Sequence, residues 1–102
     1  MNNIKKIANH YGLHPQIGKL LEELEELQIA SRHAFLDLTA APKISDDVLE
    51  NLIDEMADVA IMVEQVAYLT DTVDAVKERV EFKVNRQLER IAAEVNDEHP
   101  SN

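Results

Sequence analysis

Three long stretches carry apolar residues at spacings of three and four, the pattern of helices with one buried face. Only two Gly and three Pro occur among 102 residues. Because Gly and Pro most often end helices and form turns, their scarcity favours long helices over strands joined by turns. The expected helices are Pro15–Leu38, Asp46–Leu69 and Val73–Val95, preceded by a short amphipathic helix at Asn2–Asn9.

Short polar segments mark the expected helix ends. Gly12 should end the first helix, and Pro42 lies in the one clear loop, Thr39–Ser45. Ser45 is placed to cap the helix that follows. At ~1.5 Å per residue, each long helix spans roughly 35 Å, so the three should pack side by side. We therefore predict an all-α helix bundle of one short and three long helices, a single domain at residues 1–95 with a polar tail at 96–102.

Composition and charge exclude several classes of protein. The chain has 20 acids against 10 bases and a net charge of −10, which argues against nucleic acid or anionic membrane partners. It has no cysteine, so neither a disulfide framework nor a zinc-thiolate site is expected. No apolar run approaches the ~20 residues of a membrane span, and the N-terminus lacks the apolar stretch of a signal peptide. We expect a soluble cytoplasmic protein.

One acidic segment occurs twice, on successive expected helices. The first copy reads Leu20-x-x-Glu23-Leu24-x-Glu26-Leu27, and the second reads Leu52-x-x-Glu55-Met56-x-Asp58-Val59. On a helical wheel, two acids of each copy border the apolar stripe on the same flank. The neighbouring Glu22, Glu25 and Asp54 point further toward solvent. If the two stripes pack together, the bordering acids converge: Glu23, Glu26, Glu55 and Asp58.

Four converging carboxylates repel one another unless something neutralises them. A cluster of oxygen ligands without Cys suits Mg²⁺, with Mn²⁺ as a second possibility, rather than zinc. A di-iron carboxylate bundle is disfavoured because the chain has no Glu-x-x-His motif. The alternative is that both copies are solvated helix faces, where Glu-x-x-Glu is frequent.

The last expected helix carries a line of basic residues along one flank of its apolar stripe. Cationic side chains beside metal ions are suited to polyphosphate, since they meet the oxygens that the metals leave unbound. The alternative is a solvated face whose bases pair with nearby Glu81 and Glu89. The line consists of Arg79, Lys83, Arg86 and Arg90.

Taken together, these motifs resemble the MazG-like all-α nucleoside triphosphate pyrophosphohydrolases. The resemblance rests on Lys19-Leu20-Leu21-Glu22-Glu23-x-x-Glu26-Leu27 followed by Asp54-Glu55-x-x-Asp58-Val59. It extends over about Ile4 to Arg90. Further segments look like the small, single-domain, phage-type members: Tyr11-Gly12, Gln16, Ile61-Met62-x-Glu64-Gln65 and Lys83-x-x-Arg86.

The resemblance implies Mg²⁺-dependent cleavage of a nucleoside triphosphate to the monophosphate and pyrophosphate. It implies Glu23, Glu26, Glu55 and Asp58 as metal ligands, and Glu22 as a group that orients or deprotonates the attacking water. The substrate-binding residues that it implies are Gln16, Lys19, Lys83, Arg86 and Arg90. It also implies a homodimer or homotetramer, in which a neighbouring subunit often completes the site.

Assembly is also indicated by the helix expected at Asp46–Leu69. This helix carries apolar residues away from its main stripe, and a helix apolar on several sides is usually buried on more than one. We expect a subunit interface, the alternative being a central place in a larger bundle. The residues concerned are Ile53, Ala57, Ala60 and Ile61. The alternative to an enzyme is a non-catalytic helical oligomerisation or nucleotide-binding module with the same fold.

Overall fold

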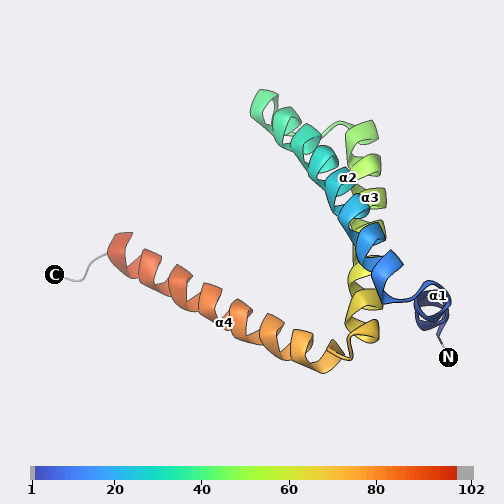
Figure 1. Ribbon diagram of the computed structural model, residues 1–102. Coiled ribbons are helices and arrows are strands. Elements are labelled where there is room, and N and C mark those ends of the chain that lie inside the picture. Colours follow the sequence, from blue (N-terminus) through green and yellow to red (C-terminus); the bar gives the residue numbers. More distant parts are fainter. Residues whose placement is uncertain (1, 99–102) are drawn as a thin grey trace. The chain divides into compact units, whose positions relative to one another are not determined.

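The computed structural model describes residues 2–98, which form four α-helices and, within that range, no strand (Figure 1). This confirms the predicted all-α class with one short and three long helices. The helices are α1 (Asn3–Tyr11), α2 (Leu13–Ala40), α3 (Asp46–Leu69) and α4 (Val73–Glu98).

The helix boundaries differ from the predicted ones by a few residues. Pro15 was expected to open α2, but the helix begins at Leu13, so Pro15 lies within its first turn, where a missing N–H is tolerated. α4 continues through the first part of the predicted polar tail, and residues 99–102 lie outside the described range.

Specific polar contacts define both ends of α1. At its start, the Asn2 side chain accepts a hydrogen bond from the Lys5 backbone N–H at 2.9 Å, a side-chain N-cap. At its end, Gly12 has φ 87° and donates its N–H to the Ala8 carbonyl at 2.8 Å. A positive φ of this kind favours glycine, which explains why the chain turns here.

Ser45 precedes α3 as predicted, but its side chain does not cap that helix. Its hydroxyl and its backbone N–H instead donate to Oδ2 of Asp37 on α2, at 2.9 and 3.0 Å. These two hydrogen bonds, the backbone one foremost, lower the pKa of Asp37. The contact therefore ties the loop before α3 to the end of α2.

α2 and α3 form an antiparallel hairpin that is joined by residues 41–45 (Figure 1). Ala30 and Ala34 are buried in α2 and Met62 in α3, and the small alanine side chains let the two helices approach closely. α1 packs mainly on α3, with Ala8 fully buried. There the Tyr68 hydroxyl donates to Asn9 Oδ1 at 3.0 Å, and Lys5 lies over the Tyr68 ring.

The buried residues of α2 coincide only in part with the apolar stripe predicted from the sequence, which consists of Ile17, Leu20, Leu24, Leu27, Ala34, Phe35 and Leu38. The buried residues of this helix are Gln16, Glu23, Ala30 and Ala34. Within the stripe, Ala34 is buried and Leu20 and Leu27 are half-buried. Its other members are exposed: Ile17, Leu24, Phe35 and Leu38. The stripe is wider than the strip that one partner helix covers, which is why much of it stays open to solvent.

The chain divides between Asp71 and Thr72 into two compact units, one containing α1 to α3 and the other containing α4. Asp71 has a positive φ of 55° at this junction. In the second unit, α4 is one amphipathic helix whose residues 73–97 are all exposed.

In residues 2–98, every helix is too short or too polar to cross a membrane.

Candidate metal centre and adjoining pocket

Four carboxylates meet midway along the α2–α3 hairpin. Each offers one oxygen atom, and these oxygens all lie within 4.8 Å of one another. We call this group the carboxylate cluster; it consists of Glu23, Glu26, Glu55 and Asp58. The structure confirms that these four acids converge, as their matched placement on the two helical wheels predicted.

The antiparallel register explains why the duplicated motif forms one cluster. Near the open end of the hairpin, Gln16 on α2 is hydrogen bonded to Gln65 on α3. Counting seven residues forward along α2 and seven back along α3 from this contact reaches Glu23 and Asp58, two members of the cluster. Three residues further on each helix are the other two members, Glu26 and Glu55. Two copies of an acid-x-x-acid motif on antiparallel helices thus face each other in reverse order.

The cluster has a buried floor and an exposed rim. Glu23 is buried and Glu55 is half-buried, whereas Glu26 and Asp58 are exposed. Within residues 2–98, only two buried side-chain polar atoms lack a hydrogen-bond partner: Oε2 of Glu23 and Oε2 of Glu55. A buried, unpartnered carboxylate oxygen is costly, so both atoms have the character of ligands for a cation.

The electrostatics of the cluster support this interpretation. Burial, followed by repulsion from Glu26 and the other two acids, raises the pKa of Glu55. Its negative charge is therefore disfavoured in the folded chain alone. Carboxylate oxygens are the ligands that hard divalent cations prefer, and the donor set fits Mg²⁺ or Mn²⁺. A cation bound there would relieve the repulsion that raises this pKa.

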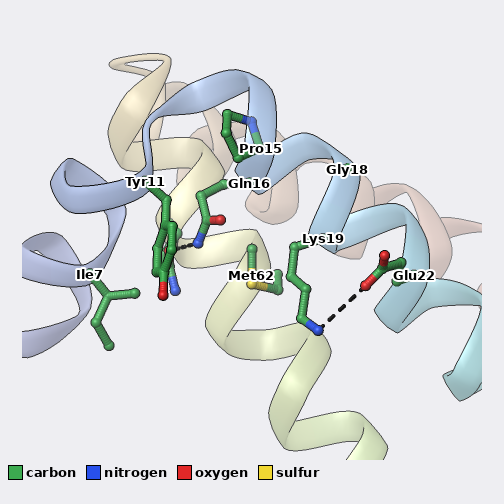
Figure 2. Close-up of a pocket in the computed structure, with 9 residues that line it drawn as sticks. Ile7, Tyr11, Pro15, Gln16, Gly18, Lys19, Glu22 and Met62 are labelled. Atoms are coloured by element: carbon green, nitrogen blue, oxygen red, sulfur yellow. Dashed lines mark hydrogen bonds and ion pairs between the residues drawn. The ribbon is translucent and has the colours of Figure 1, made fainter.

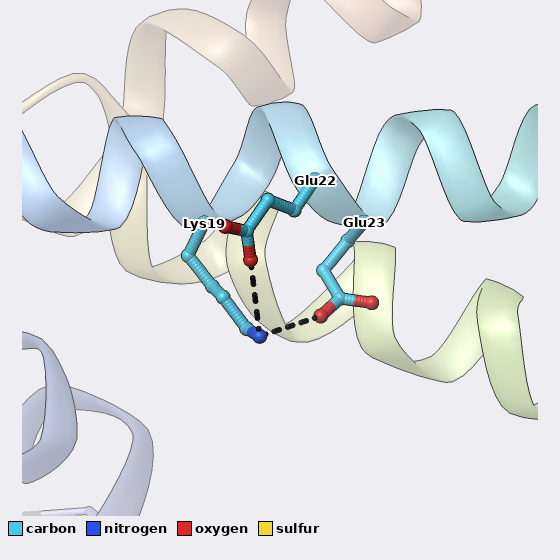
Figure 3. A network of polar contacts seen from close by, with 3 residues as sticks. All are labelled: Lys19, Glu22 and Glu23. Atoms are coloured by element: carbon cyan, nitrogen blue, oxygen red, sulfur yellow. Dashed lines mark hydrogen bonds and ion pairs between the residues drawn. The ribbon is translucent and has the colours of Figure 1, made fainter.

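Lys19 lies one helical turn before the cluster and already neutralises part of it (Figure 3). Its Nζ is 3.3 Å from Oε1 of buried Glu23 and 3.4 Å from Oε2 of exposed Glu22. The hydrogen bonds with Glu23 and then Glu22 raise the pKa of Lys19. The other oxygen of Glu23 remains without a partner. Lys19 is thus a cation at the edge of the candidate metal centre.

A pocket of about 560 Å³ adjoins the cluster at the junction of α1, α2 and α3 (Figure 2). Lys19 and Glu22 belong to its wall, so the pocket and the cluster share a boundary. Deeper in, Gln16 Nε2 donates to Gln65 Oε1 at 2.6 Å, and both side chains are almost fully buried. We call Gln16 and Gln65 the amide pair. The apolar part of the lining is Ile7, Tyr11, Pro15 and Met62.

The other acids and bases singled out from the sequence are exposed. Glu22, Glu25 and Asp54 are exposed, as the wheel predicted. The predicted phosphate-binding residues of α4 are exposed on the second unit, and their contact with phosphate stays a prediction. They are Lys83, Arg86 and Arg90.

No individual role was predicted from the sequence for Gln65 or Met62, which the structure places in the pocket together with Tyr11. One signal was present for Gln65. It follows Asp58 by the same seven residues that separate Gln16 from Glu23. In an antiparallel hairpin, this mirrored spacing pairs the two amides just as it pairs the acids.

Comparisons with models of protein families, with curated proteins and with solved structures each gave no match. The resemblance to the MazG-like family therefore rests on the acidic motifs and their flanking residues.

Proposed function

We propose that this chain is a Mg²⁺-dependent nucleoside triphosphate pyrophosphohydrolase. It would convert a ribo- or deoxyribonucleoside triphosphate to the monophosphate and pyrophosphate by attack of water. One observation carries the proposal. Four carboxylates converge on two facing helices, and two of their buried oxygens have no partner. We infer the type of reaction from the order and spacing of the acids, which resemble the MazG-like motifs.

The cluster residues would hold the metal, either Mg²⁺ or Mn²⁺. Bound there, the metal supplies charge that polarises phosphate oxygens and activates water. The buried Glu23 and half-buried Glu55 would hold it from one side, and the exposed Glu26 and Asp58 would leave an approach for substrate.

Other residues would bind and orient the substrate. Lys19 stands at the edge of the cluster, where its ammonium group can meet phosphate oxygens. Glu22 is exposed beside it, and in this proposal it would orient or deprotonate the attacking water. The support for phosphate contacts by Lys83, Arg86 and Arg90 is the resemblance to the MazG-like motifs.

We further propose that the working form is a homodimer or homotetramer. Among the described residues the buried apolar side chains are few, three alanines and one methionine: Ala8, Ala30, Ala34 and Met62. Apolar residues along the outer faces of α2 and α3 are exposed, among them Leu24, Ile53 and Met56. A core this small leaves little stability for an isolated chain, and a second copy offers the same apolar faces for pairing.

A non-catalytic nucleotide-binding module is the second candidate, and one observation favours it. Lys19 neutralises Glu23 from within the chain, so part of the acidic cluster is stabilised without any metal. Turnover distinguishes the two candidates.

The test is a panel of the common ribo- and deoxyribonucleoside triphosphates with millimolar Mg²⁺, with pyrophosphate and monophosphate as readouts. We expect release from at least one nucleotide, loss of release with chelator, and loss in Glu55→Gln. Glu25→Gln is the matched control, because Glu25 is exposed on α2 and lies outside the cluster. The absence of release from every nucleotide would overturn the proposed activity and leave the binding module.

A further inference from the structure

The pocket beside the carboxylate cluster has the chemistry of a site for a flat heterocycle. Its walls include the Tyr11 ring, Met62 and Pro15 (Figure 2). Tyr11 is 58% exposed, and its ring packs edge-on against His10, with centroids 4.7 Å apart. A ring held in this way offers its face for stacking, and every nucleobase has a flat face of its own.

The amide pair supplies the hydrogen-bonding part of the pocket. Gln16 Nε2 donates to Gln65 Oε1, and each side chain carries a second polar group besides. Gln16 has its own carbonyl oxygen, an acceptor, and Gln65 has its own NH₂, a donor. A donor and an acceptor side by side match the hydrogen-bonding edge of a base. A purely apolar ligand could not hydrogen bond with this donor and acceptor, whereas the edge of a base can.

The position of the pocket relative to the cluster fits a whole nucleotide. Gln16 and Glu23 are seven residues apart on one straight helix, or about 10 Å at 1.5 Å per residue. That separation is comparable with the distance from the base to the phosphates in an extended nucleoside triphosphate. Lys19 lies between the two places, in the pocket wall and 3.3 Å from Glu23. Glu22, on the same wall, makes this pocket unsuitable for the phosphates themselves.

We infer that this pocket binds the base of the nucleoside triphosphate, with Tyr11 stacking on it and the amide pair reading its edge. This inference rests on the proposed function, and it names Gln65 and Gln16 as residues that determine specificity. The base enters at the junction of α1, α2 and α3, and the phosphates extend along α2 past Lys19 to the cluster.

Two measurements test the inference. The first is kcat/KM for each nucleotide of the panel, compared between the unmodified chain and Gln65→Leu. We expect kcat/KM for the preferred nucleotide to fall about tenfold or more, with the preference among bases reduced. Gln28→Leu is the matched control, because Gln28 is exposed on α2, away from the pocket lining. We expect it to keep the original preference.

The second measurement is the binding of nucleosides without phosphate, followed by changes in the Tyr11 ring resonances in NMR spectra. Tyr11→Ala keeps the test valid if Gln65→Leu does not fold, because Tyr11 is more than half exposed. We expect weaker nucleoside binding in this variant and a higher KM for the preferred nucleotide. Turnover with unchanged base preference in Gln65→Leu and unchanged KM in Tyr11→Ala would overturn the pocket assignment alone. The absence of all turnover would overturn the proposed function, while nucleoside binding would still support or reject the pocket.

Discussion

At the scale of single residues, Glu55 is a member of the candidate site whose negative charge is unfavourable in the folded chain without a ligand. Its side chain is half-buried, one oxygen has no partner, and three other carboxylates lie close by. Burial and repulsion together raise its pKa, so the folded chain disfavours its charge. Such groups are retained where a ligand compensates for them, which is why they cluster at functional sites.

We therefore predict that Glu55→Gln raises the melting temperature without metal and reduces the further increase that metal produces. Without divalent cations near neutral pH, Glu55→Gln should raise the melting temperature, because it removes a charge that the fold disfavours. Millimolar Mg²⁺ should raise the melting temperature of the unmodified chain and do so much less in the variant. Differential scanning calorimetry with and without chelator measures both shifts. Asp54→Asn is the control, since Asp54 is the exposed neighbour of Glu55; an equal Mg²⁺ shift in Glu55→Gln would remove Glu55 from the ligand set.

At the scale of elements, the antiparallel register of α2 and α3 sets which side chains meet. One hydrogen bond between Gln16 and Gln65 marks the register, and the acids follow at the same spacing on both helices. Near the loop, Ala30 and Ala34 keep the helices close, and Ser45 is hydrogen bonded to Asp37. The site therefore depends on how the hairpin begins and ends as well as on its acids.

The two glycines give a matched test of backbone conformation, one just before α2 and one inside it. Gly12 has φ 87° between α1 and α2, and a Cβ added there would meet no atom within 4 Å. Gly12→Ala should therefore destabilise the chain only through its backbone, by about 1–3 kcal/mol. Gly18 lies inside α2 with equally open surroundings, so Gly18→Ala should stabilise it by about 0.5–1 kcal/mol. Urea unfolding measures both changes, and the same sign at both positions would contradict the assigned conformations.

At the scale of the whole molecule, the apolar surface exceeds what one copy buries. Within α1 to α3 the buried apolar side chains are three alanines and Met62, and α4 taken by itself carries an apolar line along one face. A monomer with so little core has little hydrophobic stabilisation to offset the entropy of ordering. This is the physical basis for expecting an oligomer.

We predict a solution mass that is a multiple of the 11.5 kDa chain, measured by light scattering after size-exclusion chromatography. Ile53, which is 45% exposed on α3, is the substitution site. Ile53→Glu should shift the mass toward the monomer and lower the melting temperature, because it places a charge in the contact. Asn51→Glu adds the same charge at an exposed polar position of the same helix and should leave the mass unchanged. A monomeric mass for the unmodified chain at micromolar concentration would contradict the prediction.

The pattern of neighbouring residues by itself determined where the helices form and which acids make up the carboxylate cluster. Scarce Gly and Pro, regular apolar spacing and the polar loop around Pro42 are properties of neighbouring residues, so they predicted four helices to within a few residues. The duplicated motif predicted which four carboxylates converge, because helical periodicity sets their direction on each helix.

Only the tertiary structure decided which face of α2 is buried, and how the amide pair and the pocket form. Periodicity gives the angle of a side chain on its own helix, but it does not give the register or the distance between two helices. The apolar stripe of α2 includes Leu24 and Phe35, which are exposed, whereas the buried face contains Gln16 and Glu23 together with Ala30 and Ala34. That face carries the polar groups of the candidate site, and it emerges only when α2 and α3 are brought together.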